Sequence, residues 1–413
     1  MTGSFIERNI RPTVVEALGE ARAVCLLGAR QSGKSTLARA ISAREHPAEY
    51  LTLDNDATRR SALEDPTGFI AGVSGAAVID EVQRAPDLML AIKERLDTNN
   101  ERGQFLLAGS ANILTLPSIA DALPGRVDYI RMWPFSQGEL HERRERFIDL
   151  LLAGEVPHID GAEVGLKAYA AKIVAGGFPD AQDRGPRGRA RFFTSYVSTI
   201  LGRDLPDIAT VRDTAGVERL LRIVAARSAA PVSSRGVAGE LGVDHKTVAA
   251  QTRILEELFL VWRLQPWHVN LGSRQVKTPK IYMTDTGLLA HLTNTGAEGI
   301  VRNPDRAGSI LETFVAMELA RQCDWAESPA SLFHYRDQQQ REVDIVLELS
   351  SGEVAGVEVK TAATAQPRDF AGLRHLRDKL GDRFKAGVVL YTGTRTLSFG
   401  ERLAAVPLCG LWA

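Results

Sequence analysis

Short apolar runs alternate with amphipathic segments along the first 110 residues of the chain. Buried strands are predicted at four of these runs, 23–27, 50–54, 76–79 and 105–109. Helices are predicted between them, at 36–41, 56–64 and 86–96. Because strands that alternate with helices form parallel sheets, this part of the chain is predicted to be an α/β domain.

Helical periodicity dominates the middle of the chain. The charged segment 139–146 is predicted to be a solvated helix, and a mostly helical, lid-like region is expected to follow to about residue 213. Three more helices are predicted, at 217–225, 237–241 and 245–253. Gly242 supplies a tight turn and Asp244 a helix cap, so these helices have the outline of a helix-turn-helix.

The last hundred residues return to an α/β pattern. A helix that carries Glu312 precedes two predicted strands, 341–347 and 356–360. Glu358 and Lys360 are two residues apart in a strand and therefore lie on the same face. The pattern brings Glu312, Asp344, Glu358 and Lys360 to one point.

Composition narrows the range of functions. The 413 residues are 44% hydrophobic and 24% charged with a formal net charge of -1, which is typical of a globular protein of several domains and gives no global case for binding nucleic acid or membranes. Three widely spaced cysteines argue against disulfides and zinc, and the chain has no long apolar run. We therefore expect a cytoplasmic protein with no membrane partner.

The segment after the first predicted strand matches the Gly-x4-Gly-Lys-Ser/Thr phosphate-binding loop. Gly28 and Gly33 let backbone N–H groups turn inward around phosphate oxygens. Lys34 is expected to reach the β and γ phosphates, and the Ser35 hydroxyl to bind Mg2+. The nucleotide-binding set is predicted to be Gly28, Ala29, Arg30, Gln31, Ser32, Gly33, Lys34, Ser35 and Thr36.

Two carboxylates follow the apolar strand 76–79, in the Walker B pattern. Asp80 is predicted to hold Mg2+, and Glu81 to orient and deprotonate the attacking water. Ser110, with Asn112, follows strand 105–109, where it either senses the γ phosphate or caps a following helix. Arg126 precedes a predicted strand and either stabilises transition-state charge, in its own or a neighbouring subunit, or is a surface arginine. Absence of an Asn-Lys-x-Asp motif favours ATP over GTP.

These motifs resemble an AAA-type ATPase, and specifically a prokaryotic family in which that module is joined to a winged helix and a C-terminal nuclease-like domain. The resemblance runs through most of the chain. The segments that carry it are Gly28–Thr36, Val78–Gln83, Leu107–Asn112, Gly125–Arg126, Met132–Ser136 and Gly176–Pro179. The resemblance implies ATP hydrolysis at the first two motifs. It divides the chain into an AAA-like ATP-binding domain (1–138), a helical lid-like region (139–213), a winged-helix module (214–300) and a nuclease-like domain (301–413).

The helix-turn-helix outline raises the question of DNA binding. Lys246, Thr247, Gln251 and Arg253 suit phosphates and base edges, and Lys277 and Lys280 are expected on a wing. Winged helices also serve as protein-contact modules and ATPase lids, so the three interpretations stay open.

The C-terminal acids resemble those of the PD-(D/E)xK nuclease fold, with Val343 before Asp344 where proline is usual. Asp344 and Glu358 would then bind Mg2+ or Mn2+, with Glu312 and Lys360 as catalytic partners. The alternative is a buried charge network without metal. Two functions follow: an ATP-driven enzyme that binds or processes DNA, or an ATP-dependent regulatory switch whose C-terminal domain binds a partner. A homo-oligomer is compatible with both.

Overall fold

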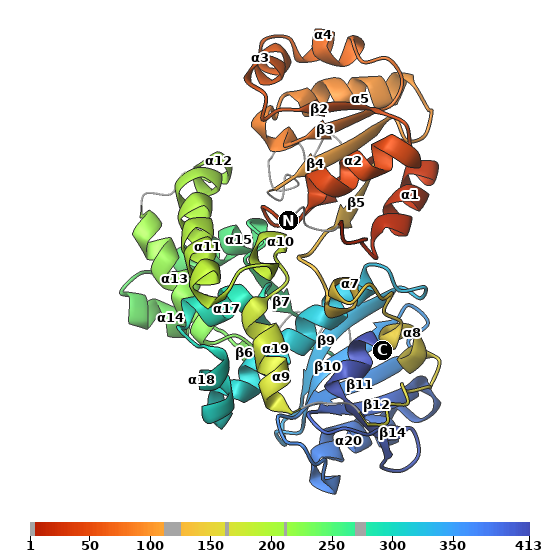
Figure 1. Ribbon diagram of the computed structural model, residues 1–413, viewed down its shortest axis with the longest axis vertical. Helices are drawn as coiled ribbons and strands as arrows, with labels where there is room; N and C mark the ends of the chain where they lie inside the picture. The colour runs from red at the N-terminus through yellow and green to blue at the C-terminus, as the bar shows by residue number, and fades with distance from the viewer. Residues whose placement is uncertain (1–4, 111–124, 162–164, 210–212, 269–277) are drawn as a thin grey trace.

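Three β-sheets organise the chain. The computed structural model describes residues 5–110, 125–161, 165–209, 213–268 and 278–413. In Figure 1 an N-terminal α/β domain occupies the top, a mainly helical middle module lies at the left, and the C-terminal sheet lies at the lower right.

The N-terminal sheet is parallel and has the strand order β2-β3-β4-β1-β5. Its strands are β1 (Ala23–Leu27), β2 (Glu49–Thr52), β3 (Ala77–Asp80), β4 (Phe105–Gly109) and β5 (Val127–Arg131). Parallel pairing of β4 with β1 and with β3 brings the carboxyl ends of these strands to one edge of the sheet. The predicted α/β domain is confirmed, with β2 ending two residues earlier than expected.

Helices cover both faces of this sheet. They are α1 (Arg11–Glu20), α2 (Lys34–Arg44), α3 (Asp56–Glu64), α4 (Pro66–Ala71) and α5 (Leu88–Thr98), with a 3₁₀ turn η1 (Val82–Arg84). Alternate residues of β1 serve opposite faces: Val24 and Leu26 pack with α1 and α2, whereas Cys25 packs in the cluster that contains α5. This alternation follows from the period of two in a strand and buries β1 completely.

The middle module combines helices with a small antiparallel sheet of order β6-β8-β7. The first helices are α9 (Leu166–Ala175), α10 (Pro179–Gln182), α11 (Pro186–Thr199), the π-helix η3 (Ile200–Asp204) and α12 (Leu205–Ile208). There follow α13 (Thr214–Ala226), β6 (Ala230–Pro231), α14 (Ser234–Leu241), α15 (His245–Glu257), β7 (Val261–Leu264), β8 (Lys280–Met283), α17 (Thr286–Leu292) and α18 (Ala297–Arg302). Gly242 has φ +67° between α14 and α15, and the Asp244 carboxylate accepts the Lys246 N–H, as the sequence predicted.

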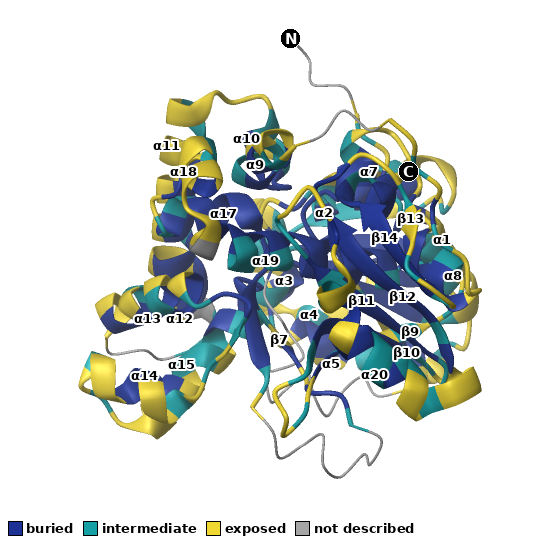
Figure 2. Ribbon diagram, turned by 90° about the horizontal axis from the view of Figure 1, so that it is seen from below, coloured by how far each residue is buried: buried dark blue, intermediate teal, exposed yellow. Residues whose placement is uncertain are grey.

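The C-terminal sheet is mixed, with the order β13-β14-β12-β11-β10-β9. Its strands are β9 (Ala330–Arg336), β10 (Glu342–Leu349), β11 (Val354–Val359), β12 (Phe384–Tyr391), β13 (Leu397–Ser398) and β14 (Leu403–Pro407). The long helix α19 (Pro304–Cys323) precedes β9, and η4 (Pro367–Phe370), α20 (Ala371–Leu380) and η5 (Gly381–Arg383) connect β11 to β12. The 3₁₀ helix η6 (Leu408–Trp412) follows β14. Figure 2 shows β11, β12 and β14 as a buried layer.

The segment 139–146 is not the solvated helix that its charges suggested. Only α7 (Gln137–Leu140) forms there, and α8 (Phe147–Leu152) lies beside β12 (Figure 1). Glu139 and Glu145 are buried, Glu139 pairs with Arg8 at 3.2 Å, and Glu145 accepts the Gly138 N–H at 2.8 Å. Arg8 is distant from Glu139 in the sequence and Gly138 offers only a backbone N–H, so the local charge pattern did not indicate that these two glutamates are buried.

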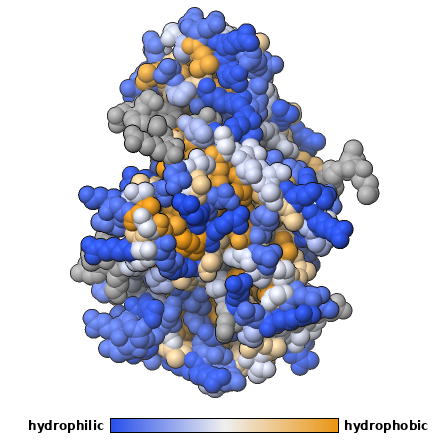
Figure 3. Space-filling view, turned by 90° about the vertical axis from the view of Figure 1, so that its left-hand side faces the viewer, coloured by the Kyte–Doolittle hydropathy of each residue, from blue (hydrophilic) through white to orange (hydrophobic). Residues whose placement is uncertain are grey.

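Figure 3 shows hydrophilic residues over much of the face that it presents, around a hydrophobic area near the centre. Within the described ranges, no helix has the length and apolar character needed to span a bilayer.

Candidate functional site

The loop between β1 and α2 has the backbone of a phosphate cradle. Gly33 has φ +98° immediately before α2, a conformation that favours glycine. A Cβ on Gly28 would lie 2.0 Å from the Met132 carbonyl oxygen, so only glycine fits there. Both glycines of the sequence motif are therefore required by the geometry.

The side chain of Lys34, the first residue of α2, is turned into this loop, and no acidic side chain among the described residues lies at hydrogen-bonding distance from it. Its side chain is 5% exposed, and Nζ donates to the carbonyl oxygens of Gly28 (2.9 Å) and Ala29 (2.8 Å). Burial lowers the pKa of Lys34 to about 8, although the charges of Glu81 and Asp80 act in the opposite direction. A buried cation held only by neutral carbonyls is suited to an anionic ligand.

Two further features support a ligand at the loop. The Ser32 hydroxyl oxygen is buried and has no hydrogen-bond partner in the part of the chain that the structure describes. A cavity of about 410 Å3 opens beside the loop, where Arg30 and Gln31 face Phe192 and Tyr196 of α11. The residues of the loop thus fit the phosphates of a ligand, and the cavity offers room for the rest of that ligand.

Asp80 ends β3 at the same edge of the sheet. Its Oδ2 accepts the Tyr50 hydroxyl at 2.6 Å, and its Oδ1 accepts the Glu81 N–H at 3.1 Å. Burial, together with the charge of Asp80, raises the pKa of Tyr50 to about 12. Both donors are neutral groups, and a carboxylate bonded in this way is suited to the coordination of Mg2+.

Glu81, Gln83 and Ser110 form a hydrogen-bonded group next to Asp80. The Ser110 hydroxyl donates to Glu81 Oε2 at 3.1 Å, and Gln83 Nε2 donates to Ser110 Oγ at 2.9 Å and also to Glu81. Glu81 itself has φ +59°, which is uncommon outside glycine and is often found at functional sites. The sequence placed Glu81 and Ser110 at neighbouring strand tips but missed Gln83, although it lies only two residues after Glu81. Asn112 lies outside the described residues.

Ion pairs connect the nucleotide loop to the middle module. Arg30 Nη1 lies 2.9 Å from Asp204 Oδ1, and Arg203 lies 3.6 Å from Asp54, which also pairs with Arg84 at 2.7 Å. Arg203 and Asp204 both belong to the π-helix η3, a geometry often found at functional sites. Local sequence carried no signal for these pairings.

Arg126 lies away from the nucleotide loop. Its carbonyl oxygen accepts the N–H of Ala23, the first residue of β1, so it stands at the amino edge of the sheet, opposite the loop. Its guanidinium pairs with Asp97. The prediction that Arg126 serves the nucleotide site of its own chain is therefore wrong, whereas a role in a neighbouring subunit stays a prediction.

The four C-terminal residues converge as the sequence predicted. Asp344 Oδ2 accepts the Val359 N–H at 2.9 Å across β10 and β11, and Lys360 Nζ lies 2.6 Å from Glu358 Oε1. Burial raises the pKa of Glu358 and of Glu312 to about 8 each, with the charge of Asp344 adding to both shifts. Burial also raises the pKa of Asp344.

Lys280 changes the chemistry of this acidic cluster, which we define as Glu312, Glu342, Asp344 and Glu358. Lys280 is 3% exposed, and Nζ lies 2.8 Å from Glu312, 2.7 Å from Glu342 and 3.6 Å from Asp344. Lys280 does lie on the β7–β8 hairpin, where a wing was expected, but it is buried there and is not available to contact DNA; Lys277 lies outside the described residues. The apolar Ile281-Tyr282-Met283 after Lys280 was the signal that this strand is buried.

A metal ion does not fit the acidic cluster as it stands. In the ranges that the structure describes, no group of three His, Cys, Asp or Glu side chains is placed to hold one. Burial alone would lower the pKa of Lys280, but the charges of Glu312, Asp344 and Glu342 outweigh it and raise the pKa. The cluster thus already contains a cation, and the expected metal role of Asp344 and Glu358 is not supported.

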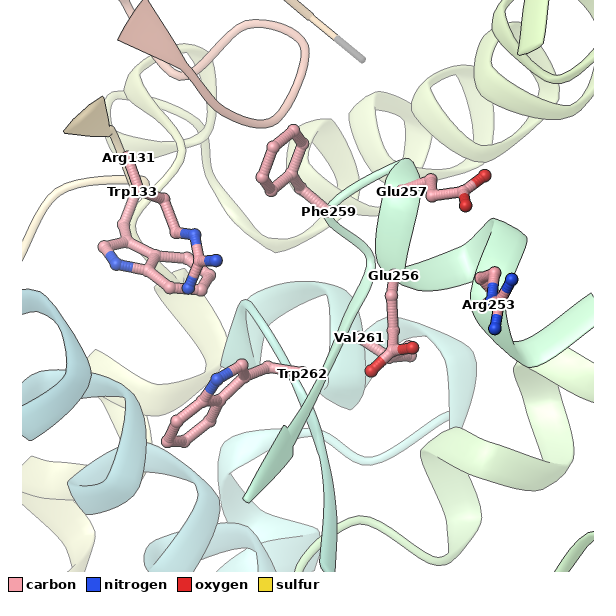
Figure 4. A pocket seen from close by; sticks show the side chains of 8 residues that line it. All are labelled: Arg131, Trp133, Arg253, Glu256, Glu257, Phe259, Val261 and Trp262. Carbon is pink, nitrogen blue, oxygen red and sulfur yellow. The ribbon is translucent and has the colours of Figure 1, made fainter. Parts of the chain in front are cut away.

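A second cavity, of about 440 Å3, lies where the N-terminal domain meets the middle module. Figure 4 shows Arg131 and Trp133 on one side and Glu256, Phe259 and Trp262 on the other. None of the described residues that line it belongs to the nucleotide loop. It is therefore separate from the candidate nucleotide site.

Comparison with known families defines the class of the N-terminal domain. Residues 20–141 match the family described as AAA domain, 166–299 match a domain of unknown function (DUF8612), and 307–411 match another (DUF4143). With its parallel sheet and phosphate-binding loop, the first domain is an AAA-type P-loop domain, a class associated with the binding and hydrolysis of ATP.

Comparison with whole proteins shows relatives over almost the full length of the chain. It is 30% identical over 405 residues to an uncharacterized protein of Mycobacterium tuberculosis (strain ATCC 25618 / H37Rv), covering 97% of this chain and 83% of the relative. The same values hold for an uncharacterized protein of Mycobacterium bovis (strain ATCC BAA-935 / AF2122/97). The chain belongs to the family of these mycobacterial proteins.

Among solved structures, the Holliday junction branch migration motor RuvB of Thermotoga maritima aligns with a TM-score of 0.27 and 16% identity, over 62% of this chain and 88% of that chain. AMPPCP-bound DnaA from Aquifex aeolicus gives 0.27 and 16%, over 60% and 86%. The strand order and the loop, rather than these alignments, define the fold class.

Proposed function

We propose that the chain hydrolyses ATP to ADP and phosphate at the loop between β1 and α2. The observation that carries the proposal is the buried Lys34, which is held by neutral carbonyls and lies close enough to Asp80 and Glu81, at the carboxyl end of β3, for their charges to act on it. Lys34 and the loop N–H groups would hold the phosphates, and Ser35 and Asp80 would hold Mg2+. The metal supplies charge neutralisation when bound.

Glu81 is the proposed base. Its carboxylate accepts hydrogen bonds from Ser110 and Gln83, which fix its orientation at the strand tip. A carboxylate so placed orients a water molecule and takes its proton as the water oxygen bonds to the γ phosphorus. The bond from that phosphorus to the oxygen that bridges the β and γ phosphates breaks, and ADP leaves. Ser110 is thereby proposed as a positioning residue for the base.

Two substitutions separate binding from chemistry. Lys34→Ala is expected to abolish ATP binding in a fluorescent-nucleotide assay, because the loop loses its cation. Glu81→Gln keeps the size of the side chain and should retain binding while turnover falls about 10²–10⁴-fold. Glu348→Gln, in the C-terminal domain, is the matched control and should behave as wild type. Unimpaired turnover by Lys34→Ala would refute the site, and lost binding by Glu81→Gln would refute the division of roles.

We further propose that hydrolysis is coupled to DNA binding by a winged helix made of α13, α14, α15 and the β7–β8 hairpin. Lys246, Thr247 and Arg253 are exposed on α15, as phosphate and base contacts require. A Lys246→Ala/Arg253→Ala variant should weaken the fluorescence anisotropy signal with duplex DNA and reduce its salt dependence. Equal binding by wild type and variant would remove α15 from the interface.

A regulatory switch is the second candidate function. The order α19, β9, β10, β11, α20, β12 resembles a PD-(D/E)xK domain, but the cation in its acidic cluster is Lys280. On this proposal the C-terminal domain binds a partner without cutting DNA. Incubation with plasmid, ATP and Mg2+ or Mn2+ should then give no cleavage, and cleavage that Asp344→Ala abolishes would favour the nuclease instead.

A further inference from the structure

The lysine in the acidic cluster comes from a different module. Lys280 is the first residue of β8 in the middle sheet, whereas Glu312 lies on α19 and Glu342 and Asp344 lie on β10. Oxygen atoms of all three acids lie within 3.6 Å of the one ammonium group. The contact therefore joins two modules through a single buried cation.

The oxygen atoms that a metal would use are largely engaged. Glu312 Oε1 also accepts the Tyr282 hydroxyl at 2.7 Å, Asp344 Oδ2 accepts the Val359 N–H, and Glu358 Oε1 is taken by Lys360. Glu358 Oε2 is buried and has no hydrogen-bond partner among the described residues. A divalent ion would have to displace an ammonium group that the chain itself holds in place.

Backbone contacts fix the position of Lys280. Lys280 pairs with Leu264, the last residue of β7. The carbonyl oxygen of Gln265, which follows Leu264, accepts the His334 N–H at 3.0 Å. The His334 carbonyl oxygen in turn accepts the Trp267 N–H at 2.6 Å. The β7–β8 hairpin is thus bonded to the edge of the C-terminal sheet, and these contacts hold the backbone of Lys280 beside the acidic cluster.

We propose that Lys280 is an internal substitute for a divalent cation: while the middle sheet is docked, its ammonium group balances the acidic cluster and excludes Mg2+ and Mn2+. The carboxylates of the acidic cluster bind Lys280 and so hold the middle module against the C-terminal domain. Metal binding becomes available only when Lys280 is removed or the hairpin undocks.

Binding of Mn2+ to the full chain without nucleotide, followed by isothermal titration calorimetry, tests the proposal. Wild type and Asp344→Asn should give the same isotherm, because the wild-type cluster takes no metal. Lys280→Met keeps an unbranched side chain that is one atom shorter and removes the charge. The variant should bind Mn2+ at least about tenfold more tightly than wild type, since a tethered competitor has been lost. Lys280→Met/Asp344→Asn should lose that gain.

Lys280→Arg keeps a cation and should retain the wild-type isotherm. Mn2+ binding by wild type that Asp344→Asn abolishes would overturn the proposal. A folded Lys280→Met variant with the wild-type isotherm, judged by circular dichroism and by retained nucleotide binding, would also overturn it. If Lys280→Met does not fold, the comparison of wild type with Asp344→Asn still decides the matter.

Discussion

Two lysines are buried in the part of the chain that the structure describes, and their environments are opposite. Lys34 is held by two neutral carbonyl oxygens and its pKa is lowered to about 8, whereas Lys280 is held by carboxylates and its pKa is raised. Lys34 has no carboxylate bonded to it among the described residues and is therefore suited to binding an anionic ligand. Lys280 is already paired with carboxylates and is therefore suited to a structural role. Burial alone does not distinguish the two roles, but the charge of the partners does.

The largest expected effect on stability comes from removing the charge of Lys280, which is paired with carboxylates. Lys280→Met leaves buried carboxylates without their partner and should lower the free energy of unfolding by about 3–5 kcal/mol. Lys34→Met removes a buried charge that has no anion and should leave the stability unchanged or increased. Urea unfolding followed by tryptophan fluorescence measures both. A similar loss in the two variants would break the comparison.

An exposed pair calibrates this measurement. Arg302 and Glu298 lie 2.9 Å apart with side chains 79% and 82% exposed, so Arg302→Met should change the stability by less than about 1 kcal/mol.

The pH dependence of ATP binding should reveal the lowered pKa of Lys34. A base whose pKa is depressed to about 8 in the free protein loses its proton as the pH rises through that value, and its attraction for phosphates goes with it. ATP affinity should therefore be about tenfold weaker near pH 9 than near pH 7. Lys34→Arg stays protonated and, if it binds, should lack this dependence. A flat wild-type profile would contradict the assigned environment.

The smallest expected effect concerns Arg126, whose ion pair with Asp97 is partly exposed. Arg126→Ala should cost less than about 1 kcal/mol of stability and leave ATP turnover unchanged in dilute monomer. Turnover that falls, and falls more at higher protein concentration, would show instead that Arg126 reaches the site of a neighbouring chain.

The sequence allowed the helices and strands to be predicted better than the ion pairs between distant residues. The strand tips at Asp80 and Ser110 follow from local periodicity and parallel pairing. The meeting of Glu312 with Asp344 was expected from the order of a helix and two strands, which here pair antiparallel. Lys280 was missed because its acids lie 32 and more residues away along the chain. The Arg30–Asp204 pair spans 174 residues and had no local signal either.

The contact between Gln265, Trp267 and His334 also protects a sheet edge. β9 is the outer strand of the C-terminal sheet, and unpaired N–H and C=O groups on such a strand invite pairing with another molecule. The hairpin covers part of that strand, with Pro266 opposite His334, while the other edge is the two-residue strand β13. Cutting the C-terminal domain away from the middle module would therefore expose unpaired backbone groups on β9, and the isolated fragment should self-associate more strongly than the intact chain.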